Sequence, residues 1–241
     1  IVFFGELHNN PVVHWLQYNL TTDLYNATDG NIILGAEMFE ADNQLILNEY
    51  LNGNISVKSF EKEARLWPNY KTDYKPLVEF AKDSSLTFVA TNIPRRYAST
   101  TYKQGLEALD NLSAEAKSYI APLPIEYDAN LKGYSDMMKQ MEGMGHANPN
   151  LPKAQAIKDA TMAYSIAEYA ESGKTFIHYN GAYHSNNYEG IIWYLNKYKP
   201  GLKIVTITSV EQKDVETLDE EFDNLANFII VVDETMTKTN N

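Results

Sequence analysis

Short apolar runs alternate with amphipathic stretches along the first part of the chain. The runs are rich in Val, Ile and Phe and are flanked by Gly, Asn or Asp, which favours buried strands over helices. The predicted strands cover residues 1–4, 32–34, 86–90, 175–177, 204–207 and 228–232. Helical spacing lies between the early strands, as at Val13, Leu16 and Leu20. Strands alternating with helices predict an α/β fold with a mostly parallel central sheet flanked by helices.

The middle of the chain breaks this alternation, because no convincing strand occurs from about residue 92 to residue 173. The pattern there predicts helices at residues 105–112, 114–120, 134–141 and 154–170, the last ended by Ser172-Gly173. We interpret residues 93–173 as a helical insertion, or cap subdomain. It would interrupt an α/β core formed by residues 1–92 and 174–234, with a flexible tail at 235–241.

Composition narrows the classes of function. The chain has 241 residues and a formal net charge of −12, which argues against non-specific binding to nucleic acid, since that needs basic surfaces. It contains no Cys, which excludes disulfides, thiolate metal sites and a Cys nucleophile. No apolar run approaches the ~20 residues of a membrane-spanning helix.

Polar side chains follow four of the predicted strands. The motif Gly5-Glu6-Leu7-His8 follows the first strand, and Gly181-Ala182-Tyr183-His184 follows the fourth. The other polar residues at strand ends are Glu37, Asn92, Arg95 and Asn180. Because parallel strands end at the same edge of a sheet, we expect these side chains to meet in one crevice.

The chemistry of this set suggests two uses. Glu6 and Glu37 follow buried strands, so each needs a hydrogen-bond partner, a counter-charge or a metal ion. Together with His8 and His184 they would suit a divalent metal such as Mn, Fe or Zn. Without a metal, the same four residues and Arg95 could act as a general acid–base group in hydrolysis. The alternative for each residue is a structural role, as a helix cap or an ion pair.

Three further residues could face the same crevice. His14 lies one helical turn after Pro11, and either faces the crevice or lies on the surface. On the predicted helix 154–170, Gln155, Asp159 and Met162 share one face, so Gln155 and Asp159 could point towards the strand ends. The alternative is that Lys158 and Asp159 are ordinary solvated charges.

The segment from Met137 to His146 is rich in Met. Methionines fill gaps in a core or form adaptable apolar surfaces for ligands, and both roles remain open here. The side chains in and beside this segment that could contact haem or ligate its iron are Tyr127, Tyr134, Met144 and His146.

Several common motifs are missing. The sequence has no Gly-x-Gly-x-x-Gly after its first strand and no Gly-Lys-Ser/Thr phosphate loop, so it lacks the usual nucleotide-binding signatures. It also lacks a Gly-x-Ser-x-Gly elbow, which disfavours a serine hydrolase of the α/β type.

The ordered motifs resemble those of a known family. The two Gly-x-x-His motifs, Glu37-Met38-Phe39, Asn92-Ile93-Pro94-Arg95 and the Gln155 to Ala163 segment are similar to those of the ChaN-like haem-binding lipoproteins. That family belongs to the superfamily of TIKI, TraB and erythromycin esterase. The resemblance runs from Phe3 to about Gly190 and implies an α/β core with a helical subdomain.

The resemblance implies a haem-binding lipoprotein of the cell envelope that takes part in haem or iron uptake. It further implies a lipid anchor upstream of Ile1, a homodimer with haem at its interface, a Tyr axial ligand and an outer-membrane receptor as partner. The hydrolytic branches of the superfamily imply an alternative, a metal-dependent peptidase or esterase. In that alternative Glu6, His8, Glu37 and His184 would form the site.

Overall fold

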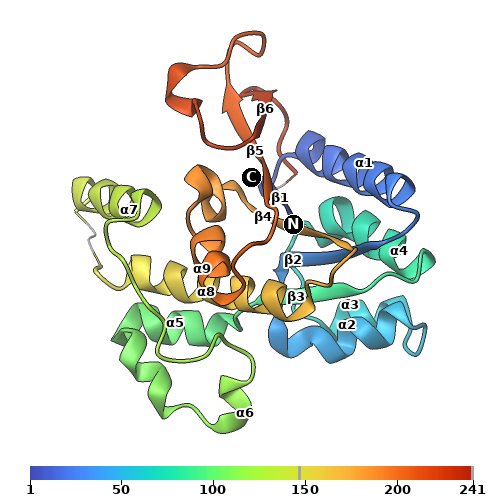
Figure 1. Cartoon of the computed structure of the whole chain (residues 1–241), viewed down its shortest axis with the longest axis horizontal. Coiled ribbons are helices and arrows are strands. Elements are labelled where there is room, and N and C mark those ends of the chain that lie inside the picture. The colour runs from blue at the N-terminus through green and yellow to red at the C-terminus, as the bar shows by residue number, and fades with distance from the viewer. Residues whose placement is uncertain (146–147, 240–241) are drawn as a thin grey trace.

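The structure is a computed structural model that describes residues 1–145 and 148–239. Its centre is a sheet with the strand order β3-β2-β4-β1-β5-β6 (Figure 1). The strands are β1 (Val2–Glu6), β2 (Ile32–Glu40), β3 (Phe88–Asn92), β4 (Thr175–Gly181), β5 (Val205–Gln212) and β6 (Phe228–Asp233). All neighbouring strands of this sheet pair in parallel. The predicted fold class is therefore confirmed.

Helices surround the sheet. They are α1 (Pro11–Ala27), α2 (Gln44–Leu51), α3 (Val57–Glu63), α4 (Lys75–Asp83), α5 (Arg95–Gln104), α6 (Ala114–Lys117), α7 (Lys132–Gly143), α8 (Leu151–Tyr169) and α9 (Ile191–Tyr198). A π-helical turn spans Tyr70–Tyr74, and 3-10 turns span Ala41–Asn43, Leu106–Asn111, Ala182–His184, Asn186–Tyr188 and Glu220–Phe222. None of the described helices combines the length and apolar character needed to cross a bilayer.

The alternation of side chains along the strands produces two cores. Phe4 and Leu34 belong to a cluster with residues of α1, α2, α3 and α4 on one face of the sheet. Phe3 and Ile33 belong to a second cluster with α8 and α9 on the other face. Successive residues of a strand point to opposite faces, so an apolar run without alternation indicates a sheet covered on both sides. Figure 1 shows the sheet between these helical layers.

The predicted helical segment 93–173 contains α5 to α8 and no strand among its described residues. Within it, α8 packs directly on the sheet. The elements α5 and Leu106–Asn111 pack on α8 through a third cluster that includes Ile93, Leu109 and Ile157. The division of the chain into a core and a cap subdomain stays a prediction.

Three local predictions in this segment were wrong in detail. Residues 106–111 form a 3-10 helix instead of an α-helix, and α6 ends at Lys117 instead of continuing to residue 120. Helix α8 ends at Tyr169, and Gly173 lies with φ +84° in the turn before β4. Helix α5 was not predicted, because its buried residues are only Ala98 and Thr101 and it offers no apolar stripe.

Candidate ligand-binding and active site

The carboxyl ends of β1, β2, β3 and β4 border a cavity of about 1270 Å³. Its lining includes all five residues predicted as an acid–base group, namely Glu6, His8, Glu37, Arg95 and His184. Ligands of open parallel sheets bind at this edge. The structure therefore brings together residues that are far apart in the sequence, while their catalytic role stays a prediction.

The glycines of the two Gly-x-x-His motifs allow β1 and β4 to meet at this edge. A Cβ atom on Gly5 would lie 2.9 Å from the Cα atom of Ala182. A Cβ atom on Gly181 would lie 2.7 Å from Cε1 of His8. Contacts this short do not occur between real side chains, so glycine at position 181 leaves room for the His8 ring against the end of β4.

Glu6 is buried and fully hydrogen-bonded. Its carboxylate accepts hydrogen bonds from Gln17 Nε2 (2.5 Å), the Tyr74 hydroxyl (2.7 Å) and Nδ1 of His8 (2.9 Å). Because a carboxylate can only accept, Nδ1 of His8 carries a proton and Nε2 is the ring nitrogen left for other partners. Burial lowers the pKa of His8, but the hydrogen bond to Glu6 and the charge of Glu37 outweigh it, so the net shift is upward.

A second buried chain of contacts contains His184. Its Nδ1 donates to Oδ1 of Asp159 (2.5 Å), and its Nε2 lies 3.3 Å from Oε1 of Glu37. The other Asp159 oxygen accepts from the Tyr134 hydroxyl (2.6 Å), and the other Glu37 oxygen accepts from the Gly181 amide (2.8 Å). Of the two expectations for Asp159, a solvated charge or a residue turned towards the strand ends, the structure shows the second.

The two carboxylates set the protonation of this chain. Burial opposes the charged form of His184, but the charges of Glu37 and Asp159 outweigh it and raise the pKa to about 10. Burial also opposes the charge of Glu37, yet His184 lowers the pKa of that carboxyl well below its usual range. At neutral pH, His184 is therefore an imidazolium between two carboxylates, suited to donate a proton or stabilise negative charge.

Arg95 belongs to a cluster of charges at the start of α5. Its Nε donates to Oε1 of Glu40 (2.6 Å), and Oε2 of Glu40 accepts from Nε of Arg65 (2.8 Å). Asp42 in turn accepts from Arg65 and from Nη1 of Arg96. Three guanidinium groups thus meet two carboxylates beside the cavity.

The expected metal site is not supported. No group of three or more His, Asp or Glu side chains within residues 1–145 and 148–239 has an arrangement that could hold a metal ion. The predicted ligands were Glu6, His8, Glu37 and His184. Both oxygens of Glu6 and both oxygens of Glu37 already have protein partners, so they are not turned towards a shared centre.

None of the candidate haem ligands among the described residues lines the cavity. The Tyr134 hydroxyl is buried on Asp159, and burial and that carboxylate raise its pKa far above the ordinary value. Tyr127 is half-buried and stacks on Tyr134, with ring centroids 5.9 Å apart. Met144 is 60% exposed just beyond the end of α7, and His146 lies outside the described residues.

Two other polar residues differ from expectation. His14 is buried behind Glu6, where its Nδ1 lies 2.9 Å from Oε1 of Gln17, so it neither faces the cavity nor lies on the surface. Asn180 is buried and contacts His178 and Ser185 instead of the cavity.

Sequence reasoning missed part of the lining. Trp67 comes from the loop before the π-helical turn, and its ring lies 4.9 Å from that of His8. Tyr183, inside the second Gly-x-x-His motif, and Met137, on α7, also line the cavity. The Trp67-Pro68 pair in a short loop was an available signal, because a large aromatic side chain outside strands and helices needs something to cover it.

The cavity wall also contains acceptors without donors. The Asn92 Oδ1 and Gln155 Oε1 atoms are buried and have no hydrogen-bond partner. The orientation of the Asn92 amide is fixed, since its Nδ2 donates to the Glu37 carbonyl (3.0 Å). Both residues of the lining therefore carry one buried acceptor whose hydrogen-bonding capacity is unused.

A parallel sheet with a cavity at its carboxyl ends defines this chain as an α/β protein with a candidate ligand site at its strand ends. A family model described as haem-binding uptake, Tiki superfamily, ChaN, matches residues 1–195. The chain therefore belongs to this haem-binding family, as the motifs predicted.

Two solved structures are similar in fold. One describes cofacial haem binding to ChaN of Campylobacter jejuni; the TM-score is 0.65 at 16% identity, over 92% of this chain and 84% of that one. The other is a protein from Bacillus cereus, with a TM-score of 0.51 at 14% identity, over 88% and 66% of the two chains. At these identities the similarity shows the fold. No curated protein matches the sequence.

Proposed function

We propose that this protein binds haem in the cavity at the strand ends, as a lipid-anchored protein of the cell envelope that takes part in haem uptake. The observation that carries the proposal is the cavity itself, which lies within the region matched by the haem-binding family. Part of the lining is apolar or aromatic, namely Leu66, Trp67, Pro68, Ile93, Met137 and Tyr183. Such a lining suits a large planar macrocycle, because it buries apolar area and allows aromatic stacking.

Iron ligands are available in this lining. His8 presents its free Nε2, and Tyr183 presents a hydroxyl on a side chain that is 36% exposed. Imidazole and phenolate both ligate haem iron. Tyr127 and Met144 lie outside this lining and, with His146 beyond the described residues, remain candidates for a haem that extends towards α7. Tyr134 would first have to leave Asp159.

Titration of the purified protein with haemin tests this function. We expect a saturable Soret shift, which weakens at least tenfold or changes its spectrum when the ligating residue is replaced. The variants are Tyr183→Phe, His8→Ala, Tyr127→Phe, Met144→Leu and His146→Ala, with the surface variant Tyr169→Phe as the matched control. A spectrum identical to haemin in buffer would refute haem binding. Sedimentation with and without haemin reports the proposed homodimer.

Envelope location and a receptor partner are part of the same proposal. A lipid anchor upstream of Ile1 would hold the protein at a membrane, and an outer-membrane receptor would deliver its haem. Fractionation of cells that express the full-length gene tests this directly. Recovery of the protein in the soluble fraction would contradict the anchor.

Hydrolysis is a second candidate function, favoured by the buried chain from Tyr134 through Asp159 and His184 to Glu37. The imidazolium of His184 could stabilise a developing oxyanion, or donate a proton to a leaving group. We expect slow ester or peptide cleavage that is reduced in Asp159→Asn, since this variant removes one of the two carboxylate charges that hold His184 protonated. Activity equal in the wild type and Asp159→Asn would refute this role.

A further inference from the structure

The carboxylates in the cavity wall all have partners within the protein. Glu37 pairs with His184, and Glu40 is shared by Arg65 and Arg95. Glu6 is held by three donors, and Glu211 is paired with Lys238 and accepts from Asn10. These four are the acidic residues that line the cavity. Despite the net charge of −12, this wall offers a cationic ligand no unpaired carboxylate.

Two cations in the same wall keep unused donors. The Nε of Arg95 donates to Glu40, and its terminal amino groups have no partner among the described residues. The Arg95 side chain is 66% exposed. Lys158 also lines the cavity, and within the described part of the chain its ammonium group has no hydrogen bond or ion pair. The unpaired charges of the cavity are therefore positive, and they suit a negatively charged group of a ligand.

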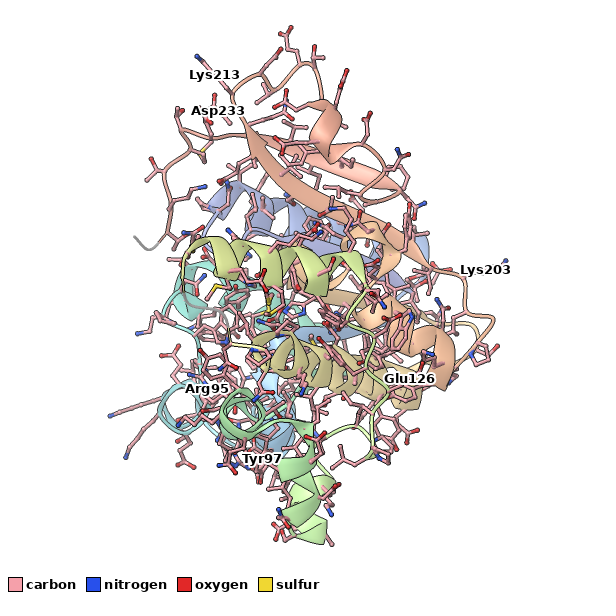
Figure 2. All side chains as sticks on the ribbon, turned by 90° about the vertical axis from the view of Figure 1, so that its left-hand side faces the viewer. Arg95, Tyr97, Glu126, Lys203, Lys213 and Asp233 are labelled. Atoms are coloured by element: carbon pink, nitrogen blue, oxygen red, sulfur yellow. The ribbon has the colours of Figure 1, made fainter. Side chains whose placement is uncertain are left out.

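The neighbours of Arg95 orient it for this task. Its partner Glu40 is nearly fully buried and is also held by Arg65, so the Nε bond fixes the direction of the guanidinium. Figure 2 labels Arg95, which begins α5 directly after β3. A guanidinium with one fixed edge still offers a second edge with two parallel N–H groups, the geometry that binds a carboxylate bidentately.

We propose that Arg95 and Lys158 form an anion-recognition pair at the edge of the cavity, which binds the carboxylate group of a ligand whose body is apolar and aromatic. The proposal deepens the proposed function, because haem is such a ligand and its propionate groups are carboxylates. Arg95 then positions the ligand, and the lining around Trp67 buries the macrocycle. This role replaces the expected catalytic role of Arg95 with a binding role.

Metal-free protoporphyrin IX and its dimethyl ester separate this role from iron ligation. The two porphyrins differ in the carboxylate charges and share the macrocycle. Quenching of tryptophan fluorescence, to which Trp67 in the cavity contributes, reports the binding of each. We expect the diacid to bind the wild type more tightly than the ester, and higher ionic strength to reduce this difference.

Substitutions identify the residues. Because the pair is partly exposed to solvent, we expect Arg95→Gln and Lys158→Gln each to weaken diacid binding roughly threefold to fivefold, and the double variant about tenfold. Binding of the ester should stay unchanged. Arg95→Lys should keep part of the effect. The matched controls are Arg96→Gln, whose guanidinium binds Asp42 outside the cavity lining, and Lys153→Gln on α8.

Equal diacid binding by the wild type and the double variant would overturn the proposal, as would an equal loss for diacid and ester. Arg95-dependent binding of the diacid without a haemin Soret shift would support the pair and contradict iron ligation. If neither haemin nor the two metal-free porphyrins bind, haem binding is refuted.

In that case, the binding of anionic anilinonaphthalene sulfonate and of neutral N-phenylnaphthylamine to the same variants tests the pair. Equal affinity of the wild type and the double variant for the sulfonate would overturn the proposal.

Discussion

Two buried histidines of the same sheet edge have pKa values that move in opposite directions. His178 is buried against Thr91 and Asn180, which are neutral, so burial lowers its pKa to about 4. His184 is equally buried but lies between Glu37 and Asp159, whose charges raise its pKa to about 10. The charge of a buried imidazole here depends on its partners rather than on its depth.

This difference predicts a pH dependence of stability. The unfolded chain releases the proton of His184 near pH 6.5, while the folded protein keeps it until about pH 10. Because the folded state binds the extra proton, the free energy of unfolding should fall as the pH rises from 6.5 to 10. The His184 contribution is then fully present below pH 6.5, and its size is on the order of a few kcal/mol.

Urea unfolding of the wild type and His184→Gln at several pH values across this range measures the effect. We expect the variant to be less stable at pH 6.5 and to show a smaller decrease towards pH 10. His178→Gln is the matched control, since His178 is neutral in both states above pH 6.5 and should leave the slope unchanged. Parallel curves for the wild type and His184→Gln would contradict the raised pKa.

At the scale of elements, the strands were the predictable part of the fold. Buried strands need continuous apolar runs, and few other local structures produce them. Their lengths were less predictable, since β4 and β5 continue to Gly181 and Gln212, and β2 continues from the predicted residues 32–34 to Glu40. The extension of β2 was hidden because Glu37 and Glu40 look like loop residues, and only their partners in the folded chain make their burial tolerable.

The same reasoning explains which parts of the site could be predicted. Glu6 and Glu37 lie in the carboxyl-terminal parts of β1 and β2, and Arg95 and His184 come shortly after β3 and β4. Topology alone therefore brings these residues to one edge. Trp67, which comes from a loop, has a position that depends on how the chain packs, and sequence periodicity carries no information about that. The predicted metal site is not supported, for a related reason. The residue types were suitable, but the sequence does not show that Gln17, Tyr74 and Gly181 already occupy the carboxylate oxygens.

At the scale of the whole molecule, the family match and the sheet do not end at the same place. The match covers residues 1–195, while β5 and β6 lie beyond it. β5 pairs with β1 in the register Val2↔Val205 to Gly5↔Thr208. The strand that bears Glu6 is thus held on one side by β4 and on the other by a segment outside the family match.

The free edge of the sheet at β3 is capped by a side chain, whereas the interior strand β1 is protected by a neighbouring strand. At the β3 edge, the Gln44 side chain closes the backbone, since its Nε2 donates to the Phe88 carbonyl (2.9 Å) and its Oε1 accepts from the Ala90 amide (2.7 Å). β1 has no such side chain, because β5 occupies that position. An apolar strand with an open edge promotes aggregation.

A chain shortened to residues 1–195 should therefore fail to fold, although it contains every residue of the cavity lining except Glu211. Removing β5 would leave the backbone of β1 unpaired along one side. It would also remove Ile207, which is partly buried and packs against the hydrophobic cluster that contains Phe4 and Tyr179. Soluble yield and thermal unfolding followed by circular dichroism test this expectation.

The matched control is a chain shortened to residues 1–233. It keeps all six strands of the described sheet and loses mainly the contacts of Lys238 with Glu211 and of Thr239 with Asp73. We expect the control to unfold cooperatively with a small loss of stability. A soluble, cooperatively unfolding 1–195 chain would show that the matched region is sufficient and that β5 is dispensable for holding Glu6 at the cavity.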